Sequence, residues 1–331
     1  FWPENLWHDE EYAKPLQDAG IEVFYGGEYV GRFDKWIEKH GKNLDAIILS
    51  RPHVSVNFID AVERYSSARR LYYGHDVHHL RLLEQMKVEP AAAINEEIER
   101  YRLLEESLWR RMNVIYYPSE LETSYVRYWL ESQGLDVCVK TLPLNAFDDP
   151  DGINPGDLMS RNGIIFVGGF GHPPNVDGAI WFVHNVLPLI EREYGDVHFY
   201  LIGSNPSKEI ISLASDRVTV TGFVSDQVLA DYYNLARVVV APLRFGGGVK
   251  GKVIEAMRFG VPCITTSAGA QGLTAALDFL QVANDVEGFA SAVIKFMRDD
   301  AAWRRCSTAS REFVRKNFSV EAVWRVVSTD L

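Results

Sequence analysis

The fold and the function are decided by the stretch Ala241-Pro-Leu-Arg-Phe-Gly-Gly-Gly-Val-Lys-Gly-Lys-Val-Ile-Glu-Ala-Met-Arg-Phe-Gly-Val-Pro-Cys-Ile-Thr-Thr266. It predicts the end of a strand, a glycine-rich loop, a short helix and then a second strand. In open parallel sheets, ligands bind at such loops, outside the carboxyl ends of the strands. The stretch therefore predicts both an α/β fold and the position of its ligand.

The residue types in this loop indicate an anionic ligand. Glycines let the backbone approach a ligand and expose its N–H groups, and a helix N-terminus favours negative charge. Lys250 and Lys252 add positive charge, and Glu255 projects from nearly the same helix face as Lys252. A cation for a phosphate and a carboxylate for hydroxyls predict a nucleotide-sugar site. Its donor-binding backbone comprises Gly247, Gly248 and Val249, with Gly246 and Gly251 beside them.

Two other readings of the loop stay open at this point. Gly246–Lys252 fits the G-x-x-x-x-G-K pattern of a nucleoside-triphosphate loop, but Val253 stands where Ser or Thr would hold magnesium. The plainer alternative is a flexible glycine turn with solvated lysines. Two lysines and a glutamate at helical spacing favour the nucleotide-sugar interpretation over a mere turn.

Outside this stretch, short apolar runs alternate with helical patterns along the whole chain. This alternation predicts an α/β fold with two Rossmann-like parallel-sheet domains that face each other across a cleft. We expect residues 1–150 to form an acceptor-side domain and residues 151–311 a donor domain, joined by a linker within 143–155. A helix at about 312–331 is expected to pack back on the first domain. The expected strands are Ile21–Phe24, Ala46–Leu49, Arg70–Tyr73, Val114–Tyr117, Val137–Lys140, Ile164–Val167, Val197–Ile202, Arg217–Val220, Val238–Ala241 and Cys263–Thr266.

Composition narrows the class of protein. The chain has 331 residues and a net charge of −11, which argues against general nucleic-acid binding. No apolar run approaches the length of a membrane span, and no secretory signal is visible. The three cysteines are sparse and lack metal-ligand spacing, which indicates a reducing compartment. We therefore expect a cytoplasmic protein.

The segment 241–266 resembles the donor-binding motif of GT-B glycosyltransferases, most closely the retaining family 4. Members often carry two glutamates across this loop and helix. Glu255 matches the second, which binds the nucleotide ribose in the family, whereas the first falls at Gly247. A branch of the family has a glycine-rich loop followed by lysine here. The resemblance implies a nucleotide-sugar donor, a glycan or lipid-linked acceptor, and no metal or other cofactor.

Other loops of the second domain are expected on the same rim of the sheet as the glycine loop. Gly203 follows a predicted strand, and Gly169, Phe170 and Gly171 follow another. These three residues either line the diphosphate or form a tight turn capped by Asn175. The segment does not fit a dinucleotide-binding fingerprint, because Pro174 replaces its last glycine. Gly222 and Phe223 resemble the family's stretch beside the nucleobase. Arg244 either adds charge at the diphosphate or belongs to a surface ion pair.

The first domain offers polar residues past two of its predicted strands. Similar segments in the family lie near the transferred sugar or the acceptor, which makes His75 and Asp76 the candidates for a base or proton shuttle. His78 and Arg81 follow, with His79. Two alternatives for this segment stay open: a capped loop whose histidines only make hydrogen bonds, and a metal site. Arg51 and His53 either meet an anionic group of the acceptor or form a proline-containing turn.

We therefore expect a retaining glycosyltransferase, with Lys252 stabilising the leaving diphosphate and Glu255 anchoring the ribose. From family habit the product is a bacterial surface polysaccharide or a lipid-linked glycan, with peripheral contact at the inner face of the membrane. The family's first strand–loop–helix unit has no counterpart before Phe1, which predicts that this sequence is part of a longer chain. A catalytically silent GT-B binding module and a sugar-nucleotide epimerase are the alternative functions.

Overall fold

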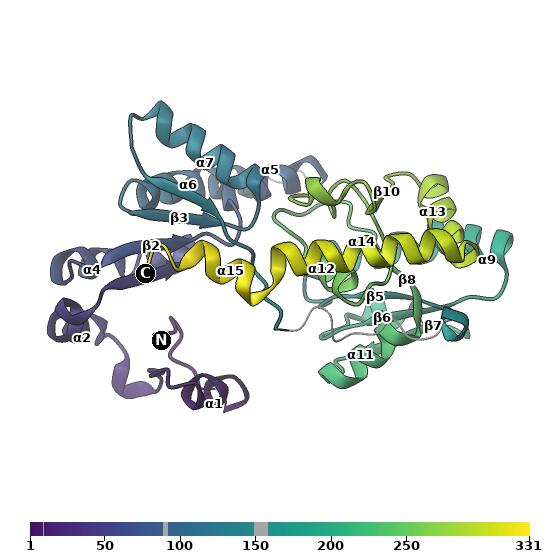
Figure 1. Ribbon diagram of the computed structural model, residues 1–331, viewed down its shortest axis with the longest axis horizontal. Helices are drawn as coiled ribbons and strands as arrows, with labels where there is room; N and C mark the ends of the chain where they lie inside the picture. Colours follow the sequence, from purple (N-terminus) through teal and green to yellow (C-terminus); the bar gives the residue numbers. More distant parts are fainter. Residues whose placement is uncertain (9, 89–91, 149–157) are drawn as a thin grey trace.

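A computed structural model describes residues 1–8, 10–88, 92–148 and 158–331. These residues form two parallel sheets with helices against them, one in each half of the elongated molecule (Figure 1). The strand order is β1-β2-β3-β4 in the first sheet and β10-β9-β8-β5-β6-β7 in the second. The predicted α/β architecture of two parallel-sheet domains is confirmed. The expected domain boundary at 150 and most of the expected linker fall on residues 149–157, outside the described residues.

The first half of the chain contains α1 (Glu10–Asp18), η1 (Gly27–Tyr29), α2 (Phe33–His40), η2 (Gly41–Asn43), β1 (Ala46–Ser50), α3 (Pro52–Ser55), α4 (Ile59–Tyr65), β2 (Arg69–Tyr73), α5 (His78–Val88), α6 (Ala92–Trp109), β3 (Val114–Tyr117), α7 (Glu120–Ser132) and β4 (Cys138–Thr141).

The second half contains η3 (Leu158–Ser160), β5 (Gly163–Val167), α8 (Pro173–Trp181), the π-helical turn η4 (Phe182–Val186), α9 (Leu187–Tyr194), β6 (His198–Ile202), α10 (Lys208–Ile211), β7 (Val218–Gly222), α11 (Asp226–Leu235), β8 (Ala236–Ala241), α12 (Gly251–Arg258), β9 (Cys263–Thr265), η5 (Thr274–Ala276), β10 (Gln281–Val282), α13 (Val286–Arg298), α14 (Asp300–Phe318) and α15 (Val320–Val327).

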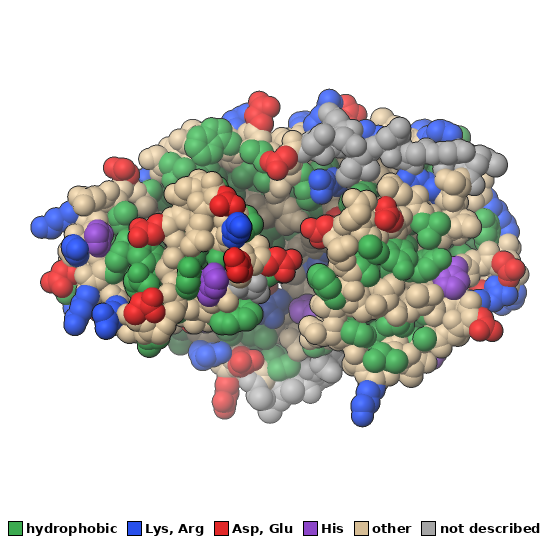
Figure 2. Space-filling model, turned by 90° about the horizontal axis from the view of Figure 1, so that it is seen from below, with side chains coloured by type: hydrophobic (Ala, Val, Ile, Leu, Met, Phe, Trp, Pro, Cys, Tyr) green, Lys and Arg blue, Asp and Glu red, His purple; other side chains and the backbone are tan. Residues whose placement is uncertain are grey.

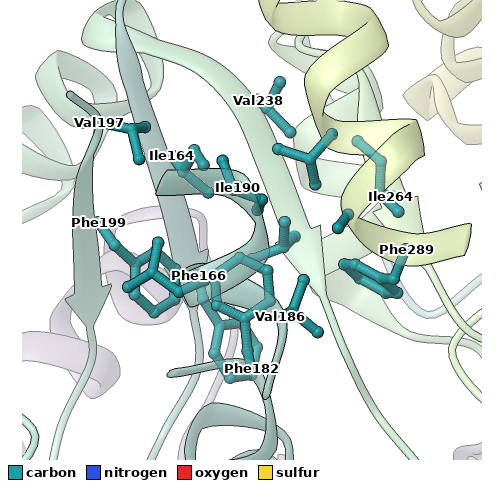
Figure 3. Packing of buried hydrophobic residues seen from close by; sticks show 14 of the residues in the cluster. Ile164, Phe166, Phe182, Val186, Ile190, Val197, Phe199, Val238, Ile264 and Phe289 are labelled. Carbon is teal, nitrogen blue, oxygen red and sulfur yellow. The ribbon is translucent and has the colours of Figure 1, made fainter. Parts of the chain in front are cut away.

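The second sheet is apolar on both faces, as a sheet sandwiched between helices must be. Because successive side chains of a strand point to opposite faces, Ile164 and Phe166 of β5 join one buried cluster while Ile165 joins the other. Figure 3 shows the first cluster, in which Phe182 and Phe289 pack against the strands. This two-sided core holds the carboxyl ends of β5, β6 and β8, where the candidate loops begin.

One predicted strand is wrong. Ile21–Phe24 forms no strand, although nine of the ten expected strands appear near their predicted positions. Its backbone instead bonds to the start of the chain, with Phe24 N–H donating to Phe1 O at 2.9 Å. Between this N-terminal region and β1 lies a cavity of about 600 Å³, lined by every residue of β1. An apolar extended segment without a neighbouring strand has no ladder to join, so the pattern alone overpredicts a strand here.

The C-terminal helices connect the two domains. Helix α14 runs along the second domain, and α15 continues from it toward the first sheet (Figure 1). Beyond α15, the buried carboxylate of Asp330 accepts hydrogen bonds from Tyr116 Oη and Lys140 Nζ, both at 2.6 Å, and lies 3.3 Å from a guanidinium nitrogen of Arg69. The end of the chain is thereby fastened to β2, β3 and β4 of the first domain.

Candidate active site

The loops of both domains enclose a cavity of about 630 Å³ between them. Figure 2 shows a hollow between the two lobes, in which basic and histidine side chains are visible. The first domain contributes Arg51, His53, His75, Asp76, His78, Arg81, Tyr101 and Leu144, and the second contributes His172, Pro174, Asn175, Leu243 and Gly246–Lys252. The structure thus brings the glycine loop together with the polar residues that end the strands of the first domain.

The glycine loop presents unused backbone donors to this cavity. Among the described residues, no backbone N–H between Arg244 and Lys252 donates a hydrogen bond. Gly246 and Gly248 have φ of 125° and 68°, which a residue with a Cβ atom adopts only under strain. Helix α12 begins at Gly251 without a side-chain cap, so its first N–H groups are free for a ligand. The loop can therefore hold an anion through its backbone.

Lys250 holds the loop in shape. Its Nζ donates to the carbonyl oxygens of Gly246, Gly247 and Gly248, at 3.2, 2.8 and 2.6 Å. Burial lowers the pKa of Lys250 to about 8, against the opposing charges of Glu122 and Asp76. Because its three donors are taken by carbonyls, this ammonium group directs the loop N–H groups rather than reaching for a ligand itself.

Lys252 is the cation that remains available at the helix end. Its Nζ donates to Oδ1 of Asn175 and lies 4.9 Å from the centre of the Phe166 ring. Burial, followed by the charge of Lys250, lowers the pKa of Lys252 to about 7. A nearby anion would reverse this shift, since it favours the charged ammonium form. The site is therefore poised to gain a proton when a diphosphate binds.

Asn175 does not cap α8 as the turn interpretation expected. The helix begins at Pro173, and His172 is the N-cap residue. The Asn175 side chain instead donates to Gly169 O at 2.7 Å and accepts from Lys252. It fixes the ammonium group of Lys252 beside Gly168, where even a Cβ atom would lie 2.7 Å from Nζ. Asn175 is thus a positioning residue between two loops of the second domain.

Glu255 lies one turn into α12 and is absent from the cavity lining. Its carboxylate accepts a hydrogen bond from Tyr233 Oη at 2.9 Å, and burial raises its pKa. Tyr233 is fully buried on α11, so the pair is rigid. The side chain stands on the same helix as Lys252.

The expected pairing of His75 with Asp76 is not found. Asp76 instead accepts from His78 Nδ1 and from Arg81 Nε, both at 2.7 Å. Burial alone would raise the pKa of Asp76, but these two partners hold it below its usual value. Asp76, together with the charge of Glu105, raises the pKa of His78 against the effect of burial. Asp76 therefore neutralises its own neighbours and is poorly suited to act as a base.

His75 is held by a different contact. Its Nε2 lies 2.8 Å from Ser50 Oγ, and burial together with the charge of Arg51 lowers its pKa to about 4. The imidazole is neutral at pH 7. The backbone φ of His75 is 65°, and that of Arg51 is 64°. Each residue follows one of two neighbouring strands, and both line the cavity. Strained residues of this kind cluster at functional sites.

Several expected donor residues lie outside the cavity. Phe170 is buried, and its N–H donates to Ser204 O at 2.8 Å. Gly203 donates to Gly222 O at 3.1 Å, and a Cβ on Gly203 would lie 1.9 Å from Gly168 O, so that glycine serves loop packing. Arg244 forms an ion pair with Asp177 through two hydrogen bonds, which matches the alternative expectation of a surface ion pair. Phe223, with 77% of its surface exposed, and Gly171 also lie away from the lining.

Glu122, His172 and Tyr101 were missed by sequence reasoning. Glu122 of α7 accepts from Ser119 Oγ at 2.6 Å, and burial raises its pKa to about 7. Its Oε1 would lie 3.9 Å from a Cβ on Gly248, so it approaches the glycine loop from the first domain. The Ser-x-x-Glu spacing signalled only a helix start. Only the fold shows that this helix start faces the glycine loop.

Within the described residues, no group of three or more His, Cys, Asp and Glu side chains is arranged to hold a metal ion. His78 and His79 lie near Glu105, but the carboxylate of Glu105 is used by the N–H groups of both and by His79 Nδ1, at 2.6 Å. No described helix is both long enough and apolar enough to cross a membrane.

Comparison by sequence finds two similarities to known proteins. Residues 161–299 match the family model described as "Glycosyl transferases group 1". An "Uncharacterized 44.6 kDa protein in cps region" of Klebsiella pneumoniae is 27% identical over 176 residues, which are 51% of this chain and 45% of that protein. The match thus spans about half the length of this curated relative.

The whole chain superposes on solved structures with two parallel-sheet domains. Anabaena HepE in complex with UDP-glucose has a TM-score of 0.70 at 14% identity, covering 97% of this chain and 89% of that chain. The fold is GT-B. Sucrose-phosphate synthase from Thermosynechococcus elongatus has a TM-score of 0.67 at 18% identity, covering 99% of this chain and 84% of that one. In GT-B terms, the cavity described above is the cleft between the two domains.

Proposed function

We propose that this protein transfers a sugar from a nucleoside diphosphate to a hydroxyl group of an acceptor bound in the interdomain cavity. One observation carries the proposal: a capless helix start, a run of unused loop N–H groups and the Lys252 ammonium group all face one cavity. Such groups stabilise the negative charge that develops on a leaving diphosphate. The match of residues 161–299 to glycosyl transferases group 1 supports the same reaction class.

In this proposal the acceptor oxygen forms a bond to the sugar carbon while the bond from that carbon to the diphosphate oxygen breaks, and the hydroxyl proton of the acceptor passes to the leaving diphosphate. Lys252 and the loop amides stabilise the leaving diphosphate. Neutral His75 hydrogen-bonds the reacting sugar or acceptor, and Asp76 orders His78 and Arg81 beside it. Glu255 and Phe223 are proposed to contact the nucleoside, along the second domain. The retaining outcome follows the family 4 resemblance.

The biological setting belongs to the same proposal. The Klebsiella relative is described as lying in a cps region, and HepE was solved with UDP-glucose. We propose UDP-hexose as the first donor to test and a glycan or lipid-linked acceptor of a bacterial surface polysaccharide. The reaction would occur in the cytoplasm at the inner face of the membrane, where nucleotide sugars meet lipid-linked acceptors.

Calorimetric titration with UDP, GDP and dTDP tests the central step. Lys252→Met should weaken binding of the preferred nucleotide about tenfold or more, the usual loss for a hydrogen bond to a charged group. Lys295→Met is a matched control, because Lys295 also lies over a phenylalanine ring, at 5.4 Å, but on the distant helix α13. Equal effects of the two substitutions would contradict the proposal.

Product analysis then separates the alternative functions. A silent GT-B module binds nucleotide or nothing and makes no product, and an epimerase interconverts free donor without an acceptor. A transferase releases nucleoside diphosphate only as the sugar appears on the acceptor.

A further inference from the structure

The first-domain wall of the cavity carries a cation that has no partner among the residues that the structure describes. The guanidinium group of Arg51 forms no hydrogen bond or ion pair with any described residue, and its side chain is exposed. Arg81, on the same wall, is bound to Asp76 at 2.7 Å. Lys250, across the cavity, is occupied by three loop carbonyls. Arg51 is therefore free to bind a ligand.

The backbone places this cation at the cavity against its own preference. Arg51 has φ of 64° and ψ of 139°, which is uncommon for a residue with a Cβ atom and more so before a proline. Hydrogen bonds hold this geometry: Arg51 N–H donates to Tyr73 O at 3.1 Å, and Ser55 N–H donates to Arg51 O at 2.9 Å. Strain of this kind persists only where the surrounding structure enforces it. Arg51 thereby lines the cavity at the carboxyl end of β1.

Two histidines flank Arg51 at this wall as uncharged hydrogen-bonding groups. His53 lines the same cavity, and its pKa is lowered by burial and by the charges of His78 and Arg51. His75 stands at the end of the neighbouring strand. The acidic side chain in the cavity lining, Asp76, already balances His78 and Arg81. An anion at this wall would therefore meet uncompensated donors.

We propose that the acceptor of this enzyme carries a phosphate group, and that Arg51 and His53 bind it at the carboxyl end of β1. This inference rests on the proposed function, because it assigns the acceptor to the first-domain wall. A guanidinium fork binds phosphate through two parallel hydrogen bonds. A carboxylate uses both of its oxygens in that fork, whereas a phosphate keeps a further oxygen for His53. Arg51 thus determines acceptor specificity, while Lys252 serves the donor.

The phosphate could belong to a phosphorylated sugar or to a lipid phosphate. Both kinds of acceptor carry the phosphate group that Arg51 would bind, and two probes distinguish them. Glucose 6-phosphate represents the first source and farnesyl phosphate the second. Glucose serves as the neutral reference. Whichever phosphate binds more tightly identifies the source, and either result supports the inference.

The experiment titrates these probes into the full chain saturated with the preferred nucleoside diphosphate, so that the donor site is occupied. Arg51→Gln should weaken binding of the better phosphate at least about tenfold, while Arg51→Lys should retain part of the affinity. His53→Gln should have a smaller effect in the same direction. Arg64→Gln on α4, an exposed arginine outside the cavity lining, is the control and should leave binding unchanged.

Two results would overturn the inference. One is binding of both phosphates no tighter than that of glucose; the other is binding that Arg51→Gln leaves intact. If nucleotide binding still depends on Lys252 in that protein, the proposed transferase function survives without a phosphorylated acceptor. If the protein binds no nucleotide but binds phosphate through Arg51, the phosphate site stands without the proposed transferase function. The midpoint of thermal unfolding of Arg51→Gln should match that of the parent protein, because glutamine, like arginine, must adopt the positive φ at position 51.

Discussion

The two walls of the interdomain cavity present different groups, backbone on one side and side chains on the other. The second-domain wall is mostly backbone: a loop whose N–H groups are unused, shaped by Lys250 and followed by the capless helix α12. The first-domain wall is mostly side chain: Asp76 bound to His78 and Arg81, with His75 on Ser50. A backbone site binds whatever anion fits it, while a side-chain wall can discriminate between acceptors. Under the proposed function, this difference suits the second-domain wall to the donor and the first-domain wall to the choice of acceptor.

The closest approach of the two walls gives the largest expected effect. A Cβ on Gly247 would lie 2.5 Å from Cβ of Arg81, so Gly247→Ala must push the walls apart. Misplacing reacting groups by about 1 Å can cost about 100-fold in rate. We expect transfer to fall by about that factor, while the affinity for nucleotide alone changes far less. Gly27→Ala, with open space around its Cβ, is the control. An equal loss of nucleotide affinity would mean that the substitution distorts the loop amides rather than the contact between the two walls.

Removing the charge of Asp76 tests whether the first wall is a cooperative network. Asp76→Asn leaves His78 and Arg81 without the negative charge that they share and should reduce the free energy of unfolding by about 1–3 kcal/mol. Asp60→Asn, which removes a 79% exposed partner of Arg111, should cost less than about 1 kcal/mol. Urea unfolding of both variants gives the comparison. A similar cost for the two substitutions would argue against a buried network.

The pH dependence of stability follows from the same pair. Asp76 has a lowered pKa, so its contribution is present above its unfolded pKa of about 3.9 and is lost as pH falls through the folded value. His78 has a raised pKa, so its contribution is complete below about 6.5 and is lost as pH rises through the folded value. Stability from this pair is therefore greatest between about pH 4 and 6.5, and Asp76→Asn should flatten that maximum.

On the second wall, pH should act on binding through Lys252. Its pKa of about 7 in the free protein should rise when a diphosphate binds, so binding takes up a proton above pH 7. The affinity should then fall by up to about tenfold for each pH unit above 7. Titrations in buffers of different ionisation heat measure the proton directly, and Lys252→Met should abolish most of the uptake. Proton release on binding would contradict this assignment.

Arg244 should have the smallest effect. It stands next to the glycine loop in sequence, but its ion pair with Asp177 is at the surface, where its side chain is 47% exposed. We expect Arg244→Gln to change the free energy of unfolding by less than about 1 kcal/mol. Nucleotide affinity should change less than with Lys252→Met. A loss as large as that of Lys252→Met would restore the sequence expectation that Arg244 contacts the diphosphate.

The sequence predicted the second wall better than the first for a physical reason. The glycine loop and α12 are contiguous, so the spacing of Lys252 and Glu255 already encodes their geometry. The first wall is assembled from Arg51, His75, Tyr101 and the nearby Glu122, which only the folded sheet brings together. The pairing of Asp76 with His78 rather than His75 depends on where α5 begins. Local patterns carry no such information.

One side of β1 pairs with no strand of the described residues, and this has a consequence for handling the protein. Ile48, in the middle of that strand, keeps 55% of its surface exposed, and the neighbouring groove is lined by Trp2, Trp36 and Phe58. A strand with free N–H and C=O groups and apolar side chains is a template for pairing with another polypeptide. Concentrated solutions of these 331 residues should therefore self-associate through β1 before they unfold. A lysine at position 48 would be the simplest remedy.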